Sequence, residues 1–466
     1  MNNNETTPEL LAKQEKAVVI AAAGCGKTHL ITEAIKYTDS GKQLILTHTH
    51  AGVLSILNKI KKNGIPAKNY RVETIAGFAL RFATSYPTIC KHTLFNEDES
   101  IIFESLYEAA SNVISCPVGR KIISVSYSGL FVDEYQDCTI DQHKLILILS
   151  ELIPTRVLGD PLQGIFDFAG ELVNWDRDVF PSFYRLSDLI KPWRWELNNR
   201  RLGVWLAQVR KHIMENDPIY LENLPCRTYW YPSNRPTQVN ALKYWSHGNT
   251  VGIIDIDNKA HDVARNLSGI YNSMEEIERR TLFKFCTEFE NNTRQNQVLS
   301  FFEFASKCMT KLKSEFKTII SSIENNKKLK GVKHQILFTL IENYLRTGEI
   351  FFILEIIDYI YSLEDNNIFR KELWNDLRKL FKTYSLNVNE SIKKLARKQV
   401  ELESVKGRFI YTKTISRPPL IKGLEFNHAI VLDADKLKPK ELYVSLTRGS
   451  TYLTILSRAK VLHPYF

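Results

Sequence analysis

The sequence has few cysteines, and their spacing offers neither a disulfide framework nor a zinc site. Seven cysteines are scattered over 466 residues, and no two of them are spaced as Cys-x-x-Cys. Scattered cysteines in odd number are typical of proteins in the reducing cytoplasm. Glycine and proline are also scarce, at 20 and 16 residues, which excludes collagen-like and linker-dominated chains.

Long hydrophobic runs are absent as well. The most apolar later stretch, Ile350–Tyr361, is interrupted by Glu355 and Asp358 and is too short to cross a bilayer. Residues 1–16 are polar and lack the basic and then apolar pattern of a secretion signal. The sequence therefore predicts a soluble, cytoplasmic protein that does not associate with membranes.

The composition is that of a folded and moderately basic protein. Hydrophobic residues make up 44% and charged residues 24%, and the formal net charge is +10. These values exclude a disordered chain. Much of the positive charge comes from Ser306–Gln335, which holds eight lysines and two glutamates. This lysine-rich segment is either a solvated helical face or a surface that contacts phosphates, and the pattern leaves both open.

Short apolar runs alternate with helical periodicity along most of the chain, which predicts an α/β fold with buried parallel strands. The runs form two clusters separated by Lys191–Asn249, which favours two α/β lobes. Ala260–Ser404 has few turn signals and a helical period, so we expect a helical insertion there. The strands expected after the first are Leu44–Thr47, Gly129–Val132, Arg156–Leu158, Val251–Ile254, Ala429–Leu432 and Tyr452–Leu456.

A phosphate-binding loop is predicted at 21–28, where the sequence reads AAAGCGKT. An apolar run precedes it and a helical pattern follows, which is the context that such a loop requires. Ala21 replaces the first glycine of the motif G-x-x-x-x-G-K-[ST]. In this motif, backbone amides hold phosphate oxygens, the lysine neutralises the β- and γ-phosphates, and the hydroxyl binds Mg²⁺. The predicted ATP contacts are Ala22, Gly24, Cys25, Gly26, Lys27 and Thr28.

Two adjacent carboxylates follow the expected strand Gly129–Val132. Asp133 would coordinate Mg²⁺ together with Thr28, and Glu134 would polarise the attacking water. Paired acids after a strand are often only first-turn charges of a helix. Together with an upstream phosphate loop, they favour nucleotide hydrolysis.

The residues Asp133-Glu134-Tyr135-Gln136-Asp137 resemble motif II of superfamily 1 DNA helicases of the UvrD/Rep/PcrA type. Further motifs of that family follow in order over residues 14–449. Segments 47–51 and 74–79 resemble motifs Ia and Ic, and segments 158–170, 192–195, 422–426 and 443–448 resemble motifs III to VI. The resemblance implies two RecA-like P-loop NTPase domains with helical insertions.

The resemblance also implies roles for residues outside the phosphate loop. Gln163 would sense the γ-phosphate, and Arg194 and Arg448 would act as arginine fingers. Trp193 would stack on the base of ATP, Glu425 would contact the ribose, and Gln14 would read the adenine. Single-stranded DNA would be contacted by His48, Phe78, Phe166 and Phe168.

Departures from the family pattern affect the DNA side more than the ATPase side. Ala169 stands where the family has an arginine after the motif III aromatic, and Ala76 replaces the motif Ic histidine. The approach to Lys422 contains Pro418 and Pro419. These changes leave two hypotheses open: a helicase that translocates and unwinds, or a DNA-sensing ATPase switch that regulates a partner nuclease. A scaffold with a vestigial site is disfavoured by the intact motifs.

The implied domains follow from the motif order. Residues 1–185 would form the first RecA-like domain, with a small helical insert at about 80–125. Residues 186–270 and 405–466 would form the second, and 271–404 a reduced accessory domain. This compact build resembles the GajB-type subunits of Gabija anti-phage systems, which implies a role in defence beside an OLD-type, GajA-like nuclease.

Overall fold

The computed structural model describes residues 5–38, 41–96, 101–165, 170–255, 257–267, 269–276, 279–328, 333–363, 367–406 and 409–465. The chain forms two compact units. Unit 1 contains Met1–Pro232, Lys422–Asn427 and Ala434–Phe466, and unit 2 contains Ser233–Ile421 and His428–Asp433.

A six-stranded sheet in the order β3-β2-β4-β5-β1-β6 forms the centre of unit 1, and all of its pairs are parallel. The structure explains the continuous apolar runs that predict buried strands, because β1, β2, β4 and β5 are buried along nearly their whole length. The strands are β1 Lys16–Ile20, β2 Gln43–Thr47, β3 Tyr70–Thr74, β4 Gly129–Val132, β5 Thr155–Gly159 and β6 Tyr184–Arg185.

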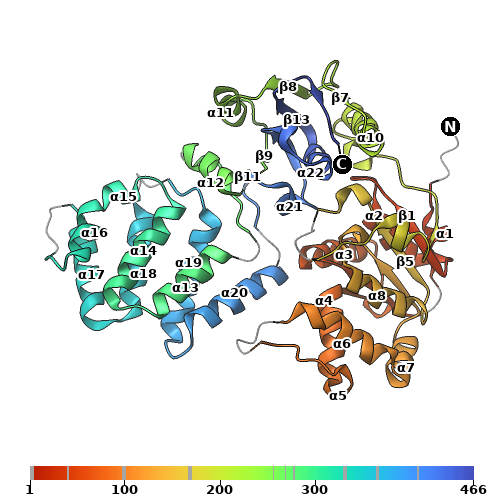
Figure 1. Ribbon diagram of the computed structural model, residues 1–466, viewed down its shortest axis with the longest axis horizontal. Coiled ribbons are helices and arrows are strands. Elements are labelled where there is room, and N and C mark those ends of the chain that lie inside the picture. The colour runs from red at the N-terminus through yellow and green to blue at the C-terminus, as the bar shows by residue number, and fades with distance from the viewer. Residues whose placement is uncertain are drawn as a thin grey trace. The chain divides into compact units, whose positions relative to one another are not determined.

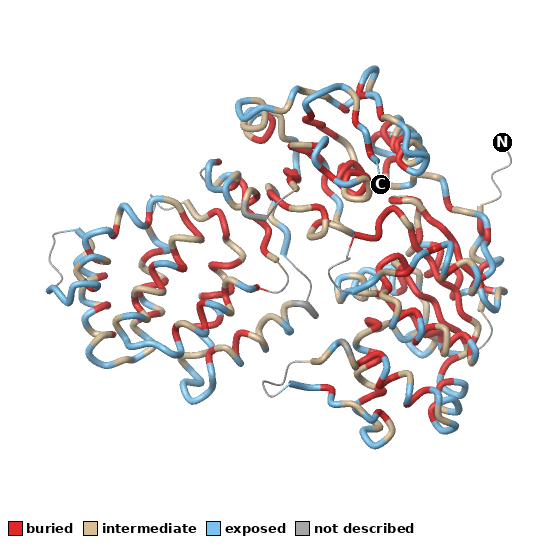
Figure 2. The backbone as a smooth tube through the Cα atoms, in the orientation of Figure 1, coloured by how far each residue is buried: buried red, intermediate tan, exposed pale blue. Residues whose placement is uncertain are grey.

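Alternate side chains of this sheet enter two separate hydrophobic cores. Val18 and Ile20 lie in one core with side chains of α4, α6 and α8, while Ala17 and Val19 lie in the other with side chains of α1, α2 and α3. Helices therefore cover both faces, and Figure 2 shows the strands as buried. The helices are α1 Pro8–Ala12, α2 Lys27–Ala34, α3 His50–Lys62, α4 Ile75–Ser85, α5 Pro87–Cys90, α6 Phe103–Ser115, α7 Pro117–Ser126 and α8 Ile140–Ser150.

A second six-stranded sheet has the order β10-β11-β9-β12-β13-β8 (Figure 1). The pairs β10–β11, β11–β9, β9–β12 and β13–β8 are parallel. Its strands are β8 Thr228–Pro232, β9 Thr250–Ile253, β10 Asn272–Ser273, β11 Lys413–Ser416, β12 Phe426–Val431 and β13 Gly449–Ser457. A two-stranded antiparallel sheet pairs β7 Ile219–Tyr220 with β14 Val461–Leu462.

Further helices accompany these strands in both units. In unit 1 they are α9 Trp193–Glu196, α10 Arg200–Glu215 and α22 Pro439–Leu446, and in unit 2 they are α11 Arg235–Tyr244, α12 Asp257–Asn266 and α21 Pro418–Ile421.

The rest of unit 2 is helical and has a hydrophobic core of its own. Buried leucine, isoleucine and phenylalanine side chains between Leu282 and Ala396 form that core. The helices are α13 Arg280–Glu290, α14 Arg294–Cys308, α15 Leu312–Glu315, α16 Lys317–Glu324, α17 Gln335–Thr347, α18 Ile350–Ser362, α19 Lys371–Leu386 and α20 Ile392–Lys406. Apolar residues at helical spacing thus pack onto one another rather than onto a sheet.

The predicted fold class is confirmed: two parallel six-stranded sheets with helical insertions. Each of the six later runs read as strands coincides with a strand, β2, β4, β5, β9, β12 or β13. The sequence did not indicate β3, β8 or β11, which lack a continuous aliphatic run. Within the described ranges no helix is both long and apolar enough to cross a membrane.

Candidate active site

The predicted phosphate loop connects the carboxyl end of β1 to the first turn of α2. Gly24 and Gly26 adopt left-handed backbone conformations, with φ of 71° and 90°. Ala21, in contrast, does not have a positive φ, and its amide continues the β1 ladder by donating to Gly159 O at 2.9 Å. The position where the motif has a glycine is therefore extended here, which explains why alanine is tolerated.

Gly24 is required for a second reason, which is close packing against α9. A Cβ atom on Gly24 would lie 2.7 Å from Trp195 Cζ3 and 2.8 Å from Arg194 Cβ. The Arg194 amide also donates to Gly24 O at 3.1 Å. Trp195 is 1% exposed, and its indole donates to Gly449 O at 2.7 Å. The loop is thus held between its own helix and a buried indole.

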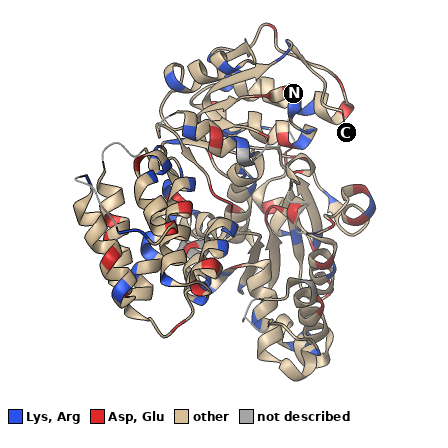
Figure 3. Cartoon of the chain, turned by 60° about the vertical axis from the view of Figure 1, so that its left-hand side comes forward, with Lys and Arg blue, Asp and Glu red and all other residues tan. Residues whose placement is uncertain are grey.

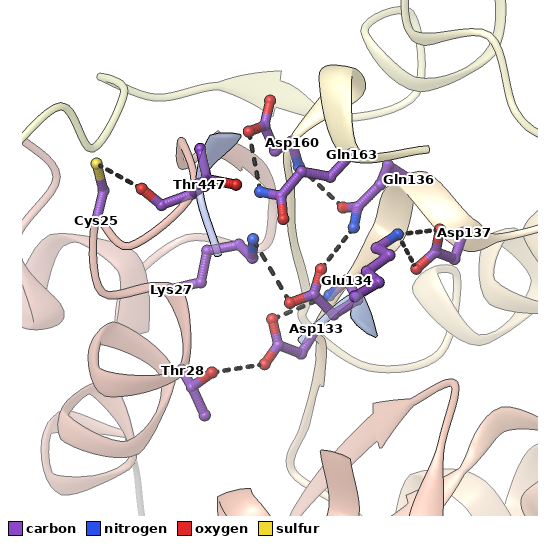
Figure 4. A network of polar contacts seen from close by, with 12 residues as sticks. Cys25, Lys27, Thr28, Asp133, Glu134, Gln136, Asp137, Asp160, Gln163 and Thr447 are labelled. Atoms are coloured by element: carbon purple, nitrogen blue, oxygen red, sulfur yellow. Dashed lines mark hydrogen bonds and ion pairs between the residues drawn. The ribbon is translucent and has the colours of Figure 1, made fainter. Parts of the chain in front are cut away.

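Lys27, Thr28 and the two carboxylates after β4 meet at the start of α2 (Figure 4). Lys27 Nζ lies 3.5 Å from Glu134 Oε1, and the Thr28 hydroxyl donates to Asp133 Oδ2 at 3.0 Å. Burial would lower the pKa of Lys27, but attraction to Glu134 and Asp133 raises it. Lys27 therefore remains a cation although its side chain is only 8% exposed.

Glu134 occupies an unusual position for a carboxylate. Its backbone is left-handed, with φ of 57°, a conformation that costs free energy in a residue other than glycine. Burial would raise the pKa of its side chain, but Lys27 and Lys422 lower it to about 2. The same burial, together with repulsion from Glu134, raises the pKa of Asp133. Glu134 is thus held ionised and is suited to accept a hydrogen bond from water.

Gln136 connects Glu134 to the turn that carries Gln163. Its side-chain NH₂ group donates to Glu134 Oε2 at 2.5 Å, and its side-chain oxygen Oε1 accepts from the Asp160 backbone amide at 2.9 Å. Asp160 is fully buried and accepts from Gln163 Nε2 at 3.0 Å. Arg210 of α10 pairs with the other Asp160 oxygen at 2.8 Å. One polar network therefore fixes the predicted water-polarising and phosphate-sensing side chains relative to each other (Figure 4).

Arg194 lies beside the loop, where its guanidinium is held by protein acceptors. It donates to Glu425 Oε1 at 2.8 Å and to Thr447 O at 2.8 Å. Trp193 is 54% exposed, and Lys191 Nζ lies 3.6 Å from the centroid of its indole. A Cβ on Gly26 would come within 3.5 Å of Trp193 Cδ1, so the indole borders the phosphate loop. An exposed ring at that place is available for stacking on a base.

Arg448 is almost fully buried at the end of α22. It donates to Val444 O at 2.9 Å, Leu424 O at 3.1 Å and Thr447 Oγ1 at 2.9 Å. Burial and the nearby Arg194 lower the pKa of Arg448 to about 9. Two neighbouring guanidinium groups in a buried place favour an anion between them, because such a ligand relieves their repulsion.

Two contacts between distant segments were not predicted from the sequence. Lys422 forms an ion pair with both carboxylate oxygens of Asp137, and both side chains are at least 95% buried. The Tyr443 hydroxyl accepts from the Ala23 amide of the phosphate loop at 3.1 Å. Asp137 and Lys422 stand within the quoted motifs, but nothing in the sequence indicated that they pair. Arg210 belongs to no motif at all.

Of the remaining predicted residues, Gln14 and Phe78 make contacts outside this cluster, whereas His48 lies beside it, where Lys422 and Glu134 act on its charge. Gln14, which follows α1, donates to Leu10 O of that helix at 3.3 Å. Phe78 is 0% exposed and packs on Phe82 in the hydrophobic core, with ring centroids 4.9 Å apart, a placement that disfavours contact with DNA. The imidazole of His48 lies 3.5 Å from Cys138 Sγ, and burial lowers its pKa to about 3. Phe166 and Phe168 lie outside the described residues.

The donor set suits a Mg²⁺ ion that the protein binds together with a phosphate, rather than an ion that the protein holds by itself. Among the described residues, no group of three or more His, Cys, Asp or Glu side chains is placed to hold a metal ion. Thr28 and Asp133 offer one hydroxyl and one carboxylate to an ion that also binds phosphate. Mg²⁺ is commonly held in this way, with one or two carboxylates, water and substrate phosphates.

Comparison with known sequences gives a short match. No family model matches the chain. The RecBCD enzyme subunit RecB of Buchnera aphidicola is 29% identical over 110 residues, which cover 23% of this chain and 9% of RecB. The aligned part is thus less than a tenth of that relative.

Comparison with solved structures finds helicases at low similarity. The Pif1 helicase of Candida albicans has a TM-score of 0.41 and 12% identity, covering 96% of this chain and 93% of that one. A Bacteroides Pif1 helicase, solved with ADP-AlF3 and single-stranded DNA, has a TM-score of 0.32 and 13% identity, covering 55% of this chain and 54% of its own. The arterivirus nonstructural protein 10 helicase, solved with DNA, has a TM-score of 0.27 and 15% identity, covering 51% of this chain and 47% of its own. The chain is therefore similar to helicases in these comparisons, and the last two matches span about half of each protein.

Proposed function

We propose that this chain is an ATP-hydrolysing DNA helicase of superfamily 1, of the UvrD-like type, which couples hydrolysis to movement on single-stranded DNA. The observation that carries the proposal is the convergence of Lys27, Thr28, Asp133 and Glu134 at the first turn of α2. A cation and a helix N-terminus suit phosphates, a hydroxyl with a carboxylate suits Mg²⁺, and an ionised carboxylate suits an attacking water.

Each residue has a distinct role in this proposal. The amides of the loop and Lys27 would bind the β- and γ-phosphates, and Mg²⁺ would neutralise phosphate charge when held by Thr28 and Asp133. Glu134 would orient the water and accept its proton. Gln163, fixed by Asp160, would contact the terminal phosphate and report its loss.

The two arginines would complete the site from the segments around α9 and α22. Arg194 and Arg448 now donate to protein acceptors, so engaging a phosphate means exchanging some of those hydrogen bonds. An arginine finger contributes about 10³–10⁵ in rate, so this exchange is the step that would link ATP binding to a rearrangement. We propose the domain division at about residues 185, 270 and 405 as the mechanical basis of that coupling.

A second candidate function is a DNA-sensing ATPase switch that licenses a partner nuclease of the OLD type in anti-phage defence. The observation in its favour is Ala169, which lacks the guanidinium that the helicase family places after the motif III aromatic. A strand-displacement assay run beside an ATPase assay separates the two functions. DNA-stimulated hydrolysis without displacement supports the switch.

Two substitutions test the proposed roles at the phosphate loop. Lys27→Ala should abolish hydrolysis and weaken nucleotide binding, because Lys27 holds the phosphates. Glu134→Gln should abolish hydrolysis but keep ATP bound, because Glu134 acts on water. Lys36→Ala and Glu33→Gln are matched controls, since these residues form a surface pair at the other end of the same helical segment. Equal ATP affinity of the two site variants, measured with a fluorescent nucleotide, would contradict these roles.

A further inference from the structure

A cleft in unit 2 is lined almost entirely by polar and basic side chains. It has a volume of about 490 Å³ and lies between α12, the first turn of α13 and the last turn of α14. Among the described lining residues, Asp262 is the acidic one, and the basic ones are Arg265, Arg280, Lys284, Lys307 and Arg370.

The inner wall of this basic cleft is fixed. Arg370 has 8% of its side chain exposed, donates through Nε to Glu275 Oε1 at 2.7 Å, and donates to Thr281 Oγ1 at 3.3 Å. The His261 imidazole lies 2.6 Å from Ser273 Oγ. Because these groups are held by buried partners, the wall keeps its shape whether or not a ligand is present.

The outer wall carries cations that can change partners at little cost. Arg280 and Lys284 are 75% and 71% exposed, and their partners Glu276 and Glu288 lie 3.9 and 3.8 Å away. Lys307 pairs with Glu303 at 2.8 Å and is 40% exposed. Exposed pairs of this kind contribute about 0–1 kcal/mol, so a phosphate oxygen can replace the carboxylate.

The first turn of α13 borders the cleft, and there the Arg280 amide donates to Glu276 Oε1 at 3.1 Å. Its N-cap residue, Arg279, makes no side-chain capping hydrogen bond to the helix. Arg280 and Thr281, which open the helix, both line the cleft. A carboxylate thus already occupies the positive end of the helix dipole, so the attraction of the cleft for phosphate depends on its side chains.

The lining also limits the class of ligand. The described residues that line it include no aliphatic side chain and no Phe, Tyr or Trp, so a stacked base is not favoured. What remains is recognition of anionic groups by charge and hydrogen bonding. A sequence-independent phosphodiester backbone has that chemistry.

We propose that the basic cleft binds the phosphate backbone of the DNA on which the proposed ATPase acts. The proposal rests on the proposed function and adds a contact surface in unit 2. The proposal also gives different roles to two lysines of the lysine-rich segment, since Lys307 lies in the cleft whereas Lys333 pairs with Glu315. Figure 3 shows acidic and basic residues mixed over the helices. The proposal therefore depends on the residues of the cleft and not on the overall charge of the helices.

A charge-matched pair of triple variants tests the cleft. The first replaces Arg280, Lys284 and Lys307 by Gln. The control replaces Lys317, Lys327 and Lys328 by Gln as well. These three lysines are exposed and do not line the cleft. Both variants lose three positive charges, so only position differs. The measurement is the fluorescence anisotropy of a labelled single-stranded oligonucleotide over a range of salt, without ATP, after thermal unfolding has shown that both variants fold.

The cleft variant should flatten the slope of log affinity against log salt by up to about 2, because each phosphate contact on a single strand contributes about 0.7. The control should keep the wild-type slope. An unchanged slope in the cleft variant, or equal flattening in both, overturns the proposal. Inorganic tripolyphosphate should compete poorly, and tight competition would overturn it by assigning the cleft to free polyphosphate.

The outcome also separates the cleft from the proposed function. A wild-type chain that binds no oligonucleotide at the lowest salt overturns both proposals. Binding with a wild-type slope in the cleft variant overturns the cleft alone. A wild-type chain that binds DNA through the cleft but never hydrolyses ATP supports the cleft and overturns the proposed ATPase.

Discussion

Replacing Gln136 by Met should slow ATP hydrolysis while leaving nucleotide affinity within a few-fold. Methionine keeps the length and volume of glutamine but removes both of its hydrogen bonds. Glu134 then loses the donor that orients its carboxylate, and the Asp160 amide loses its acceptor. Gln136 is 2% exposed, so solvent cannot replace either partner.

The size of the effect follows from these two bonds. A hydrogen bond to a charged group contributes about 1.5–3 kcal/mol. If the transition state loses this free energy because Glu134 is no longer oriented, kcat falls about 10- to 150-fold, since 1.36 kcal/mol corresponds to a factor of ten. The Asp160 amide, left without an acceptor, should lower the free energy of unfolding by roughly 1–3 kcal/mol.

Gln142→Met is the matched control. Gln142 is 8% exposed, donates to the Tyr107 hydroxyl at 2.7 Å, and accepts from the Thr139 amide at 3.1 Å. The substitution therefore removes the same two kinds of bond from the same unit, but away from Glu134. It should lower stability by a similar amount and leave kcat within about two- to three-fold of wild type.

The assays are steady-state ATP hydrolysis with saturating DNA, titration with a fluorescent nucleotide, and urea unfolding. A Gln136→Met variant that is folded and hydrolyses ATP at the wild-type rate refutes the orienting role. If the Gln142→Met control loses as much kcat, the loss in Gln136→Met results from general destabilisation and not from the orientation of Glu134.

Three further variants probe other parts of the structure. Arg448→Ala should keep ATP binding within a few-fold and reduce DNA-stimulated turnover by at least about 10³, and near-normal turnover would remove Arg448 from the site. Gly24→Ala should weaken nucleotide binding and lower the melting temperature more than Gly64→Ala, which has the same backbone strain but nothing within 4 Å of its added Cβ. His428, whose pKa burial lowers to about 3, stabilises the fold fully above its unfolded pKa of about 6.5, and this contribution is lost as the pH falls toward 3. Urea unfolding at pH 7 and pH 5 should show that His428→Leu loses about 2 kcal/mol less stability than the wild type between these pH values, since His48, whose pKa is also about 3, contributes equally to both proteins.

The sequence predicted the local parts of the site because those parts are encoded locally. A strand, a small-residue loop and a helix place Lys27 and Thr28 together within a few residues, and Asp133 follows directly on a buried strand. Buried parallel strands were identified for the same reason, since burial on both faces leaves a continuous apolar run. Strands such as β3 carry polar residues, so the same criterion misses them.

The partners of the buried charges could not be predicted, because nothing in a linear pattern says which cation reaches which carboxylate. Asp160 and Arg210 are 50 residues apart, and Asp137 and Lys422 are 285 apart. Burial makes these pairs obligatory, since an unpaired charge in the interior is strongly unfavourable, but burial is known only from the fold. The resemblance to helicase motifs named Arg448 as a catalytic group, whereas its hydrogen bonds to Val444 and Leu424 also give it a structural role.

The division of unit 1 along the chain has a consequence for the order of folding. The contact between Ala23 and Tyr443 spans 420 residues, and the first two of the three segments of unit 1 are joined through Ser233–Ile421 of unit 2. Closing a flexible loop of roughly 190 residues costs about 5 kcal/mol of chain entropy, far more than one hydrogen bond returns. Prior folding of unit 2 replaces most of that flexible loop by ordered chain, so we expect the hydrophobic core of the helices to form before the last side chains of the proposed ATP site assemble. Destabilising that core should therefore slow the recovery of ATPase activity on refolding, although the proposed site residues all lie outside the range of the core, Leu282 to Ala396.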